Sequence, residues 1–112
     1  MYSVKFSHNF NKKLFCNCFT SFRVFNDAKY KIGRQYLIQL KIRKEYRNIC
    51  EAELVTYQVF KLEEVPEYLA RLDTGFTRED FIQVLERIYI NYHVDIHQAN
   101  FMMLLFKKIL IF

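Results

Sequence analysis

The sequence is poor in residues that interrupt secondary structure, with two glycines and one proline among 112 residues, so short loops are expected. Long apolar runs are missing too, because FMMLLF at 101–106 is far below the roughly 20 residues that cross a bilayer. Residues 1–19 contain no uninterrupted apolar stretch of the kind found in secretory signals. These absences predict a soluble, cytoplasmic protein with no membrane partner. The 52% of hydrophobic residues exclude a disordered chain, and the length predicts a single domain over residues 1–112.

Cysteine is also scarce, with only Cys16, Cys18 and Cys50. An odd number of cysteines without a secretory signal predicts free thiols in a reducing compartment. Cys16 and Cys18 form a C-x-C motif that, together with a histidine, would suggest zinc, but a second matched pair of ligands is missing. Small buried thiols are therefore the favoured interpretation. We predict no metal and no cofactor.

Acidic residues are scarce in the first half of the chain. Residues 1–50 contain eleven Lys and Arg against two acids, a net charge of +9, whereas residues 51–112 contain six against ten, a net charge of −4. A half this basic indicates a face that attracts a polyanion, and nucleic acid is favoured over membrane because no long basic amphipathic helix is visible. The alternative is an ordinary solvated surface. Charge alone leaves both interpretations open.

The sequence does contain a series of strand patterns. Phe, Val and Thr favour a strand over 19–25, and residues 35–42 alternate apolar and polar side chains. A short strand is expected near 3–7, and NDAKYKIG, ending at Gly33, predicts a turn. In the run 49–62 the apolar residues change face near Leu54–Val55, which indicates a bulge or bend of the kind that small barrels use. The apolar run 101–112 is expected to be a buried strand, with a helix as the alternative.

Two helices are expected before this last strand. The first has Val65, Leu69 and Leu72 at helical spacing and ends at Gly75, where a left-handed cap is expected. The second begins at Thr77, which can cap its first turn. Its core-facing stripe is expected to contain Phe81, Val84, Leu85, Ile88 and Tyr92.

The order of these elements predicts an α+β domain, a partly open β-barrel with two helices packed on its side. Within its curved sheet we expect the strand at 19–25 to pair with the strand at 35–42, and the helix that begins at Thr77 to pack on this sheet.

The stretch CFTSFRVF contains the first candidate site. Period-2 alternation places Thr20 on one face with Phe22, and Ser21 and Arg23 on the other face with two phenylalanines, Phe19 and Phe25. A guanidinium beside a hydroxyl suits a phosphate or a base edge, and the flanking rings suit a stacked base. The alternative is that Arg23 pairs with Asp73 or Glu53 and only stabilises the fold.

A basic turn follows this strand. Lys29, Lys31 and Arg34, around Tyr30, are expected to form a rim that contacts phosphate, with an ordinary solvated turn as the alternative.

The motif F-T-S-F-R, followed by K-Y-x-x-G and an alternating strand, resembles the ASCH domain family of the PUA-like superfamily. The later run YLARLDTGFTREDFIQVLERIY is similar to the helical region of that family. The likeness covers roughly residues 15 to 108 and is greatest to small uncharacterised bacterial or phage-borne proteins. It implies a small pseudo-barrel that binds RNA or modified nucleosides.

The resemblance also implies specific site residues. The acetylcytidine amidohydrolase branch of the family uses a lysine, a threonine and a glutamate, with an arginine nearby. The arginine falls on Arg23 and the threonine on Ser21, or on Thr20 after a shift of one residue. The lysine falls on Cys18 and the glutamate near Thr74, with Asp73 the nearest acid, so two residue types are unmatched.

The predicted function is therefore binding of RNA or a nucleotide-like ligand by Thr20, Ser21, Arg23, Lys29, Tyr30 and Lys31. An ASCH-type hydrolase, acetylcytidine amidohydrolase or ribonuclease-like, is the alternative, with Ser21 and Asp73 as catalytic candidates. A protein-interaction module is the third possibility, because eight tyrosines and twelve phenylalanines leave room for an apolar patch.

Overall fold

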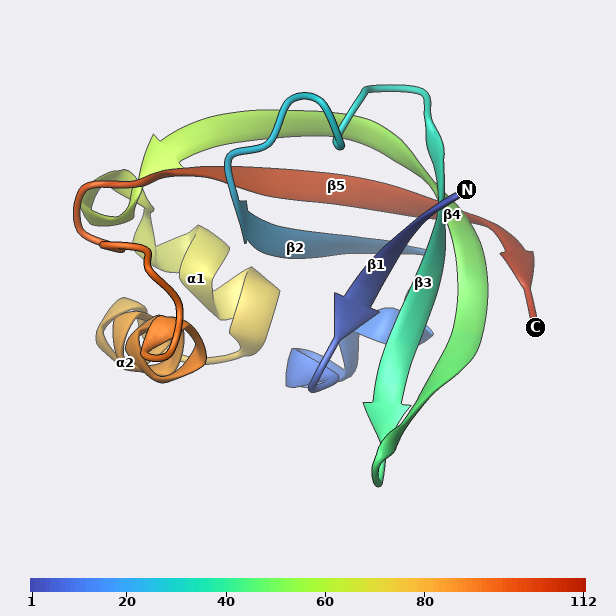
Figure 1. Cartoon of the computed structure of the whole chain (residues 1–112), viewed down its shortest axis with the longest axis horizontal. Coiled ribbons are helices and arrows are strands. Elements are labelled where there is room, and N and C mark those ends of the chain that lie inside the picture. The colour runs from blue at the N-terminus through green and yellow to red at the C-terminus, as the bar shows by residue number, and fades with distance from the viewer.

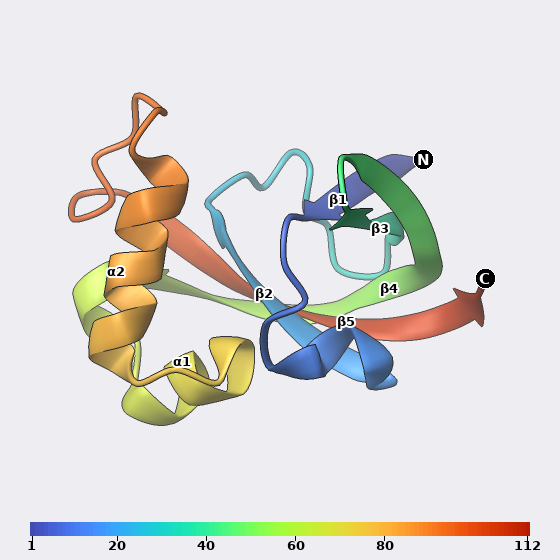
Figure 2. The ribbon, with the colours of Figure 1, turned by 90° about the horizontal axis from the view of Figure 1, so that it is seen from below.

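Five strands form one curled sheet with helices at one end of it, in a computed structural model that describes all residues 1–112 (Figure 1). Figure 2 shows the two α-helices at the end of the sheet opposite to β1 and β3. The elements in chain order are β1 (Tyr2–Phe6), the 3-10 helix η1 (Phe10–Phe15), β2 (Cys18–Val24), β3 (Gln35–Ile42), β4 (Glu45–Lys61), the 3-10 helix η2 (Leu62–Glu64), α1 (Glu67–Thr74), α2 (Arg78–Tyr89) and β5 (Asn100–Ile111).

The strand order is β1-β3-β4-β5-β2, with β1 parallel to β3 and the other pairs antiparallel. The sheet curls into a half-barrel whose edge strands are β1 and β2. The predicted direct pairing of the 19–25 strand with the 35–42 strand is wrong, because β2 pairs with β5 and β3 pairs with β1 and β4. The physical reason lies in β5, which is apolar on both faces along FMMLLF and is buried best between two neighbouring strands.

The strand β4 makes the corner of the half-barrel. It pairs with β3 over Glu45–Glu53 and with β5 over Cys50–Lys61, and it bends between the two ends (Figure 1). Its register with β5 shifts between Leu54 and Thr56. This shift confirms the predicted bulge near Leu54–Val55. Val55, at the bulge, and Val59, after it, are both exposed. The side chains that change face at the bulge therefore point into solvent.

Buried side chains form two clusters, one on each side of β2. Thirteen residues fill the inside of the curled sheet, among them Phe19 and Phe106. Ten residues pack between the sheet and the helices. In this second cluster the ring of Phe22 stacks on Phe101 at 4.6 Å and meets Phe81 of α2 edge-on at 5.2 Å. The predicted packing of the second helix on the sheet is therefore confirmed.

Local capping signals were predicted correctly at both helices. The Thr77 hydroxyl accepts a hydrogen bond from the Asp80 backbone N–H, and Gly75 ends α1 with a left-handed φ of 81°. The predicted apolar stripes are only partly buried, however. Leu72 lies on the exposed face of α1, and Tyr92 is exposed because α2 ends at Tyr89, before it.

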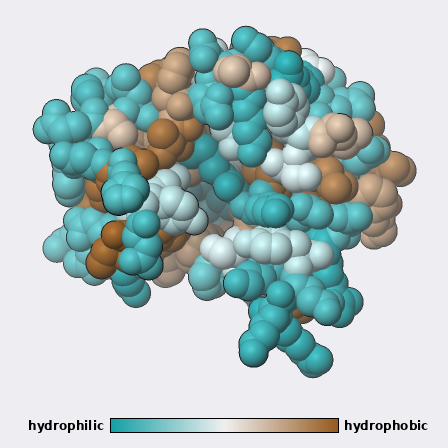
Figure 3. Space-filling view, in the orientation of Figure 1, coloured by the Kyte–Doolittle hydropathy of each residue, from teal (hydrophilic) through white to brown (hydrophobic).

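All three cysteines are free. Burial raises the pKa of the Cys50 thiol, whereas Cys16 and Cys18 are exposed. The expectation of buried thiols is thus wrong for the C-x-C pair, which lies where η1 joins β2. No helix in the structure has the length and apolar character that crossing a membrane requires. In Figure 3 the lower projection is hydrophilic, and Figure 1 places the charged tip of the β3–β4 hairpin there.

Candidate ligand-binding site

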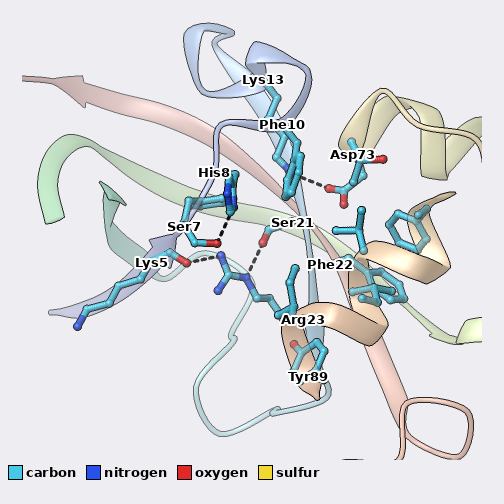
Figure 4. A pocket seen from close by; sticks show the side chains of 16 residues that line it. Lys5, Ser7, His8, Phe10, Lys13, Ser21, Phe22, Arg23, Asp73 and Tyr89 are labelled. Atoms are coloured by element: carbon cyan, nitrogen blue, oxygen red, sulfur yellow. Dashed lines mark hydrogen bonds and ion pairs between the residues drawn. The ribbon is translucent and has the colours of Figure 1, made fainter. Parts of the chain in front are cut away.

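A cavity of about 110 Å³ lies where β1, η1, β2 and the two α-helices meet (Figure 4). Half of its sixteen lining residues are hydrophobic. This combination, with a few converging polar groups beside hydrophobic walls, is typical of small-molecule sites. The polar and charged lining residues are Lys5, Ser7, His8, Lys13, Ser21, Arg23, Asp73 and Thr74, and the hydrophobic ones are Phe6, Phe10, Phe22, Phe81, Val84, Leu85, Ile88 and Tyr89.

Arg23 joins the two edge strands of the half-barrel. Its Nε donates to Ser21 Oγ at 2.7 Å and its Nη2 to the backbone carbonyl of Lys5 at 2.7 Å (Figure 4). The guanidinium lies over the Phe6 ring, 4.7 Å from its centre. No carboxylate forms an ion pair with Arg23, so the alternative of pairing with Asp73 or Glu53 is wrong. The guanidinium is held in place while its charge remains available.

Lys13 and Asp73 form a buried ion pair on the other side of the cavity. Lys13 Nζ lies 2.7 Å from Asp73 Oδ1, and the Thr20 hydroxyl donates to the same oxygen at 2.8 Å. The two charged residues are only 7% and 4% exposed. Burial lowers the pKa of Lys13, whereas attraction to Asp73 opposes this shift. A buried ion pair that lines a cavity, with the pKa of its lysine lowered by burial, marks a candidate functional site.

Lys13 is the residue that sequence reasoning missed. The resemblance placed the family's lysine at Cys18, which is exposed, and left that residue type unmatched, whereas in the structure Lys13 brings an ammonium into the cavity. Lys13 belongs to η1, where Asn11 and Lys12 have left-handed backbone angles, so no periodic pattern marks the segment. Asp73, by contrast, was named from the sequence, and it does line the cavity.

The apolar wall comes mainly from α2. Phe81 and Leu85 are buried against the sheet, whereas Val84 and Ile88 of the same predicted stripe complete the cavity wall. Tyr89 closes it near Arg23. Burial raises the pKa of the Tyr89 hydroxyl, and both the nearby Arg23 and a hydrogen bond with the Val24 backbone oppose the shift.

The two rings predicted to flank Arg23 are placed differently. Phe19 is 3% exposed and stacks on Phe106 inside the sheet, at 5.5 Å, so it is not available to a base. Phe25 lies beyond the end of β2 and does not line the cavity. The ring that contacts Arg23 is Phe6, from the first strand.

The predicted rim lies in the loop between β2 and β3. Tyr30 is a core residue, 5% exposed, and packs on Tyr36. Lys29 is half-buried, and its Nζ lies 5.3 Å from the centre of the Tyr30 ring. Lys31 is exposed and, like Lys29, does not line the cavity.

Neither a family model nor a curated protein matches the sequence. Among solved structures, the fold is similar to that of protein EF3133 from Enterococcus faecalis V583, whose family model is DUF984, with a TM-score of 0.70. The similarity covers 100% of this chain and 82% of that chain at 10% sequence identity. The likeness establishes the fold. This α+β half-barrel with two helices agrees with the PUA-like fold that the sequence resemblance implied.

Proposed function

We propose that this chain is an ASCH-like domain that binds RNA or a nucleotide-like ligand, with one ring of the ligand inserted into the cavity. The observation that carries the proposal is the Arg23 guanidinium, which two hydrogen bonds orient and no carboxylate neutralises. Such a group suits bidentate contacts to a phosphate or to a base edge. The order of the ASCH-like sequence motifs and the half-barrel fold support the same proposal.

The size and polarity of the cavity define what part of a ligand it accepts. An engineered apolar cavity of about 150 Å³ binds benzene. A cavity of about 110 Å³ therefore accepts a ring-sized group, and the remainder of a nucleotide lies outside it. The wall of Val84, Leu85 and Ile88 suits the face of a base, while Arg23 and Ser21 suit its polar edge.

Replacing Arg23 by Ala tests this proposal. We expect the affinity for ribonucleosides or short single-stranded RNA to fall about 10- to 150-fold, because a charge-assisted hydrogen bond contributes about 1.5–3 kcal/mol. The measurement is calorimetric or NMR titration with both ligand types at constant salt concentration. Arg47→Ala is the matched control, because it removes the same charge from an exposed position on β4. Unchanged affinity together with a lower Tm for Arg23→Ala would show that Arg23 acts only in the fold.

A hydrolase is the second candidate function, and the Lys13–Asp73 pair favours it. The cavity contains an ammonium, a carboxylate and the Ser21 hydroxyl, which are the residue types that amide hydrolysis uses. The unmatched lysine and glutamate argue against the amidohydrolase chemistry that the resemblance implies, and Lys13 supplies a lysine in the cavity from another position in the chain.

Acetylcytidine separates the two functions. The hydrolase predicts acetate release by the wild type, reduced about 10²- to 10⁴-fold in Ser21→Ala. The binding function predicts no release and a loss in affinity for Ser21→Ala of only about 0.5–1.5 kcal/mol. Ser7→Ala is the matched control, because Ser7 lines the same cavity but bonds only to the neighbouring His8.

A further inference from the structure

The Asp73 carboxylate uses only one of its two oxygens within the protein. Its Oδ1 accepts two hydrogen bonds, from Lys13 Nζ at 2.7 Å and from the Thr20 hydroxyl at 2.8 Å. Its Oδ2 accepts none, although the residue is only 4% exposed. Each carboxylate oxygen has two acceptor sites, so Oδ2 retains its full capacity to accept. A buried acceptor without a donor is costly, and a ligand that donates to it removes that cost.

This free oxygen faces the cavity. Every side-chain nitrogen or oxygen atom that is fully buried in the protein has a hydrogen-bond partner. Asp73 Oδ2 has no partner, so it is not sealed within the core. Asp73 lines the cavity, and Figure 4 shows its carboxylate directed inward among the other lining side chains. The oxygen is therefore open to a ligand in the cavity.

Unused donors lie in the same cavity. The Lys13 ammonium has three N–H groups and donates one of them, to Asp73. The Ser21 hydroxyl accepts from Arg23 Nε, and its own proton has no acceptor in the protein. Lys13 and Ser21 both line the cavity and are 7% and 1% exposed. The cavity thus combines one buried acceptor with buried donors, and Lys13 places such a donor next to the carboxylate.

A ligand that satisfies these groups needs an N–H donor beside an acceptor. The polar edges of nucleobases have this pattern, because uracil has a ring N–H between two carbonyls and cytosine has an amino group beside a ring nitrogen. A volume of about 110 Å³ matches one six-membered ring rather than the fused rings of a purine. In pyrimidine nucleosides the ribose is attached on the side of the ring away from this edge. Insertion edge first therefore leaves the ribose and its phosphate outside the cavity.

We infer that the cavity binds a pyrimidine base edge first, with Asp73 Oδ2 accepting an N–H of the base and Lys13 and Ser21 donating to the acceptor beside it. The inference rests on the proposed function, in which one ring of an RNA or nucleotide-like ligand occupies the cavity. It makes Asp73 a residue that determines specificity, because a base edge without an N–H would leave a buried carboxylate oxygen without a donor.

The experiment compares pyrimidine nucleosides with and without this N–H, titrated into the wild-type chain and followed by NMR. The pairs are uridine with 3-methyluridine and cytidine with N4,N4-dimethylcytidine. We expect each N-methylated nucleoside to bind about 10- to 150-fold more weakly than its parent, because it cannot donate to the Asp73 oxygen. The matched controls are 5-methyluridine and 5-methylcytidine, which add a methyl group, retain every N–H and should keep most of the parent affinity.

The variant Asp73→Asn inverts the group that faces the base. Lys13 and Thr20 both donate at the Oδ1 position, so they hold the amide oxygen there, and the amide nitrogen takes the place of Oδ2. We expect this variant to bind parent and N-methylated nucleosides with a ratio of about one. Both are measured on one preparation, so a lower stability of the variant affects them alike. Asp27→Asn, at an exposed position between β2 and β3, is the matched control and should keep the wild-type ratio.

Each other outcome contradicts a defined part of the inference. N-methylated nucleosides that bind the wild type as tightly as their parents would overturn the role of Asp73 and leave the proposed function intact. A preference that survives in Asp73→Asn would do the same, because another group would then accept the N–H. Adenosine or guanosine binding more tightly than both pyrimidine nucleosides would overturn the assignment to a pyrimidine. If the wild type binds no nucleoside and no short single-stranded RNA, the inference and the proposed function both fail.

Discussion

Replacing Lys13 by Met is expected to lower the free energy of unfolding by about 3–5 kcal/mol, because it leaves a buried carboxylate without its counter-ion. Asp73 is 4% exposed, and its Oδ1 would retain only the Thr20 hydroxyl as a donor. A loss of this size is a large part of the roughly 5–15 kcal/mol that stabilises a typical domain. Urea denaturation followed by circular dichroism measures it.

Two further variants separate the charge from the loss of packing. Lys12→Met changes the neighbouring exposed lysine and should leave the unfolding midpoint close to that of the wild type. The double variant Lys13→Met/Asp73→Leu removes both charges and should recover most of the lost stability, since apolar residues often replace a buried ion pair without cost. A double variant as unstable as Lys13→Met alone would contradict this account.

Replacing Phe81 by Ala is expected to cost about 3–5 kcal/mol, because a large aromatic side chain leaves a cavity in the core. Phe81 is 1% exposed, and its ring packs edge-on against Phe22, which stacks on Phe101. These contacts attach α2 to the sheet and so hold one wall of the ligand cavity. Chemical denaturation measures the stability, and the same ligand titration measures the cavity.

Ile88→Ala is the matched control on the same helix. Ile88 also lines the cavity but is 40% exposed, so its truncation should change the unfolding midpoint much less than that of Phe81. Ligand affinity should weaken in both variants. If Phe81→Ala unfolds at the same urea concentration as the wild type, other contacts attach α2 and the role given to Phe81 is wrong.

Part of the candidate site could be predicted from the sequence. Ser21 and Arg23 were found because they are polar residues within an aromatic strand, and Asp73 because it is the acid nearest to the position where the resemblance places a glutamate. All three line the cavity. Lys13 could not be predicted, because its partner Asp73 is 60 residues away and its own segment has irregular backbone angles.

The sequence by itself determined the features that depend on near neighbours. The bulge after Leu54, the left-handed Gly75 and the Thr77 cap each depend on a few adjacent residues, and the structure has all three. The alternation predicted for 35–42 is present at Tyr36 and Ile38 but is lost by Ile42, which is exposed. The period of hydrophobic residues and the capping of helices depend on residues close together in the chain, so both can be predicted from the sequence alone.

Only the tertiary structure decided which distant segments meet. The pairing of β2 with β5, the burial of Phe19 and the contact of Arg23 with the backbone of Lys5 all join residues far apart in the chain. These choices depend on burying both faces of β5 and on closing the gap between two edge strands. Such energies belong to the whole packed domain, and no single stretch of sequence contains them.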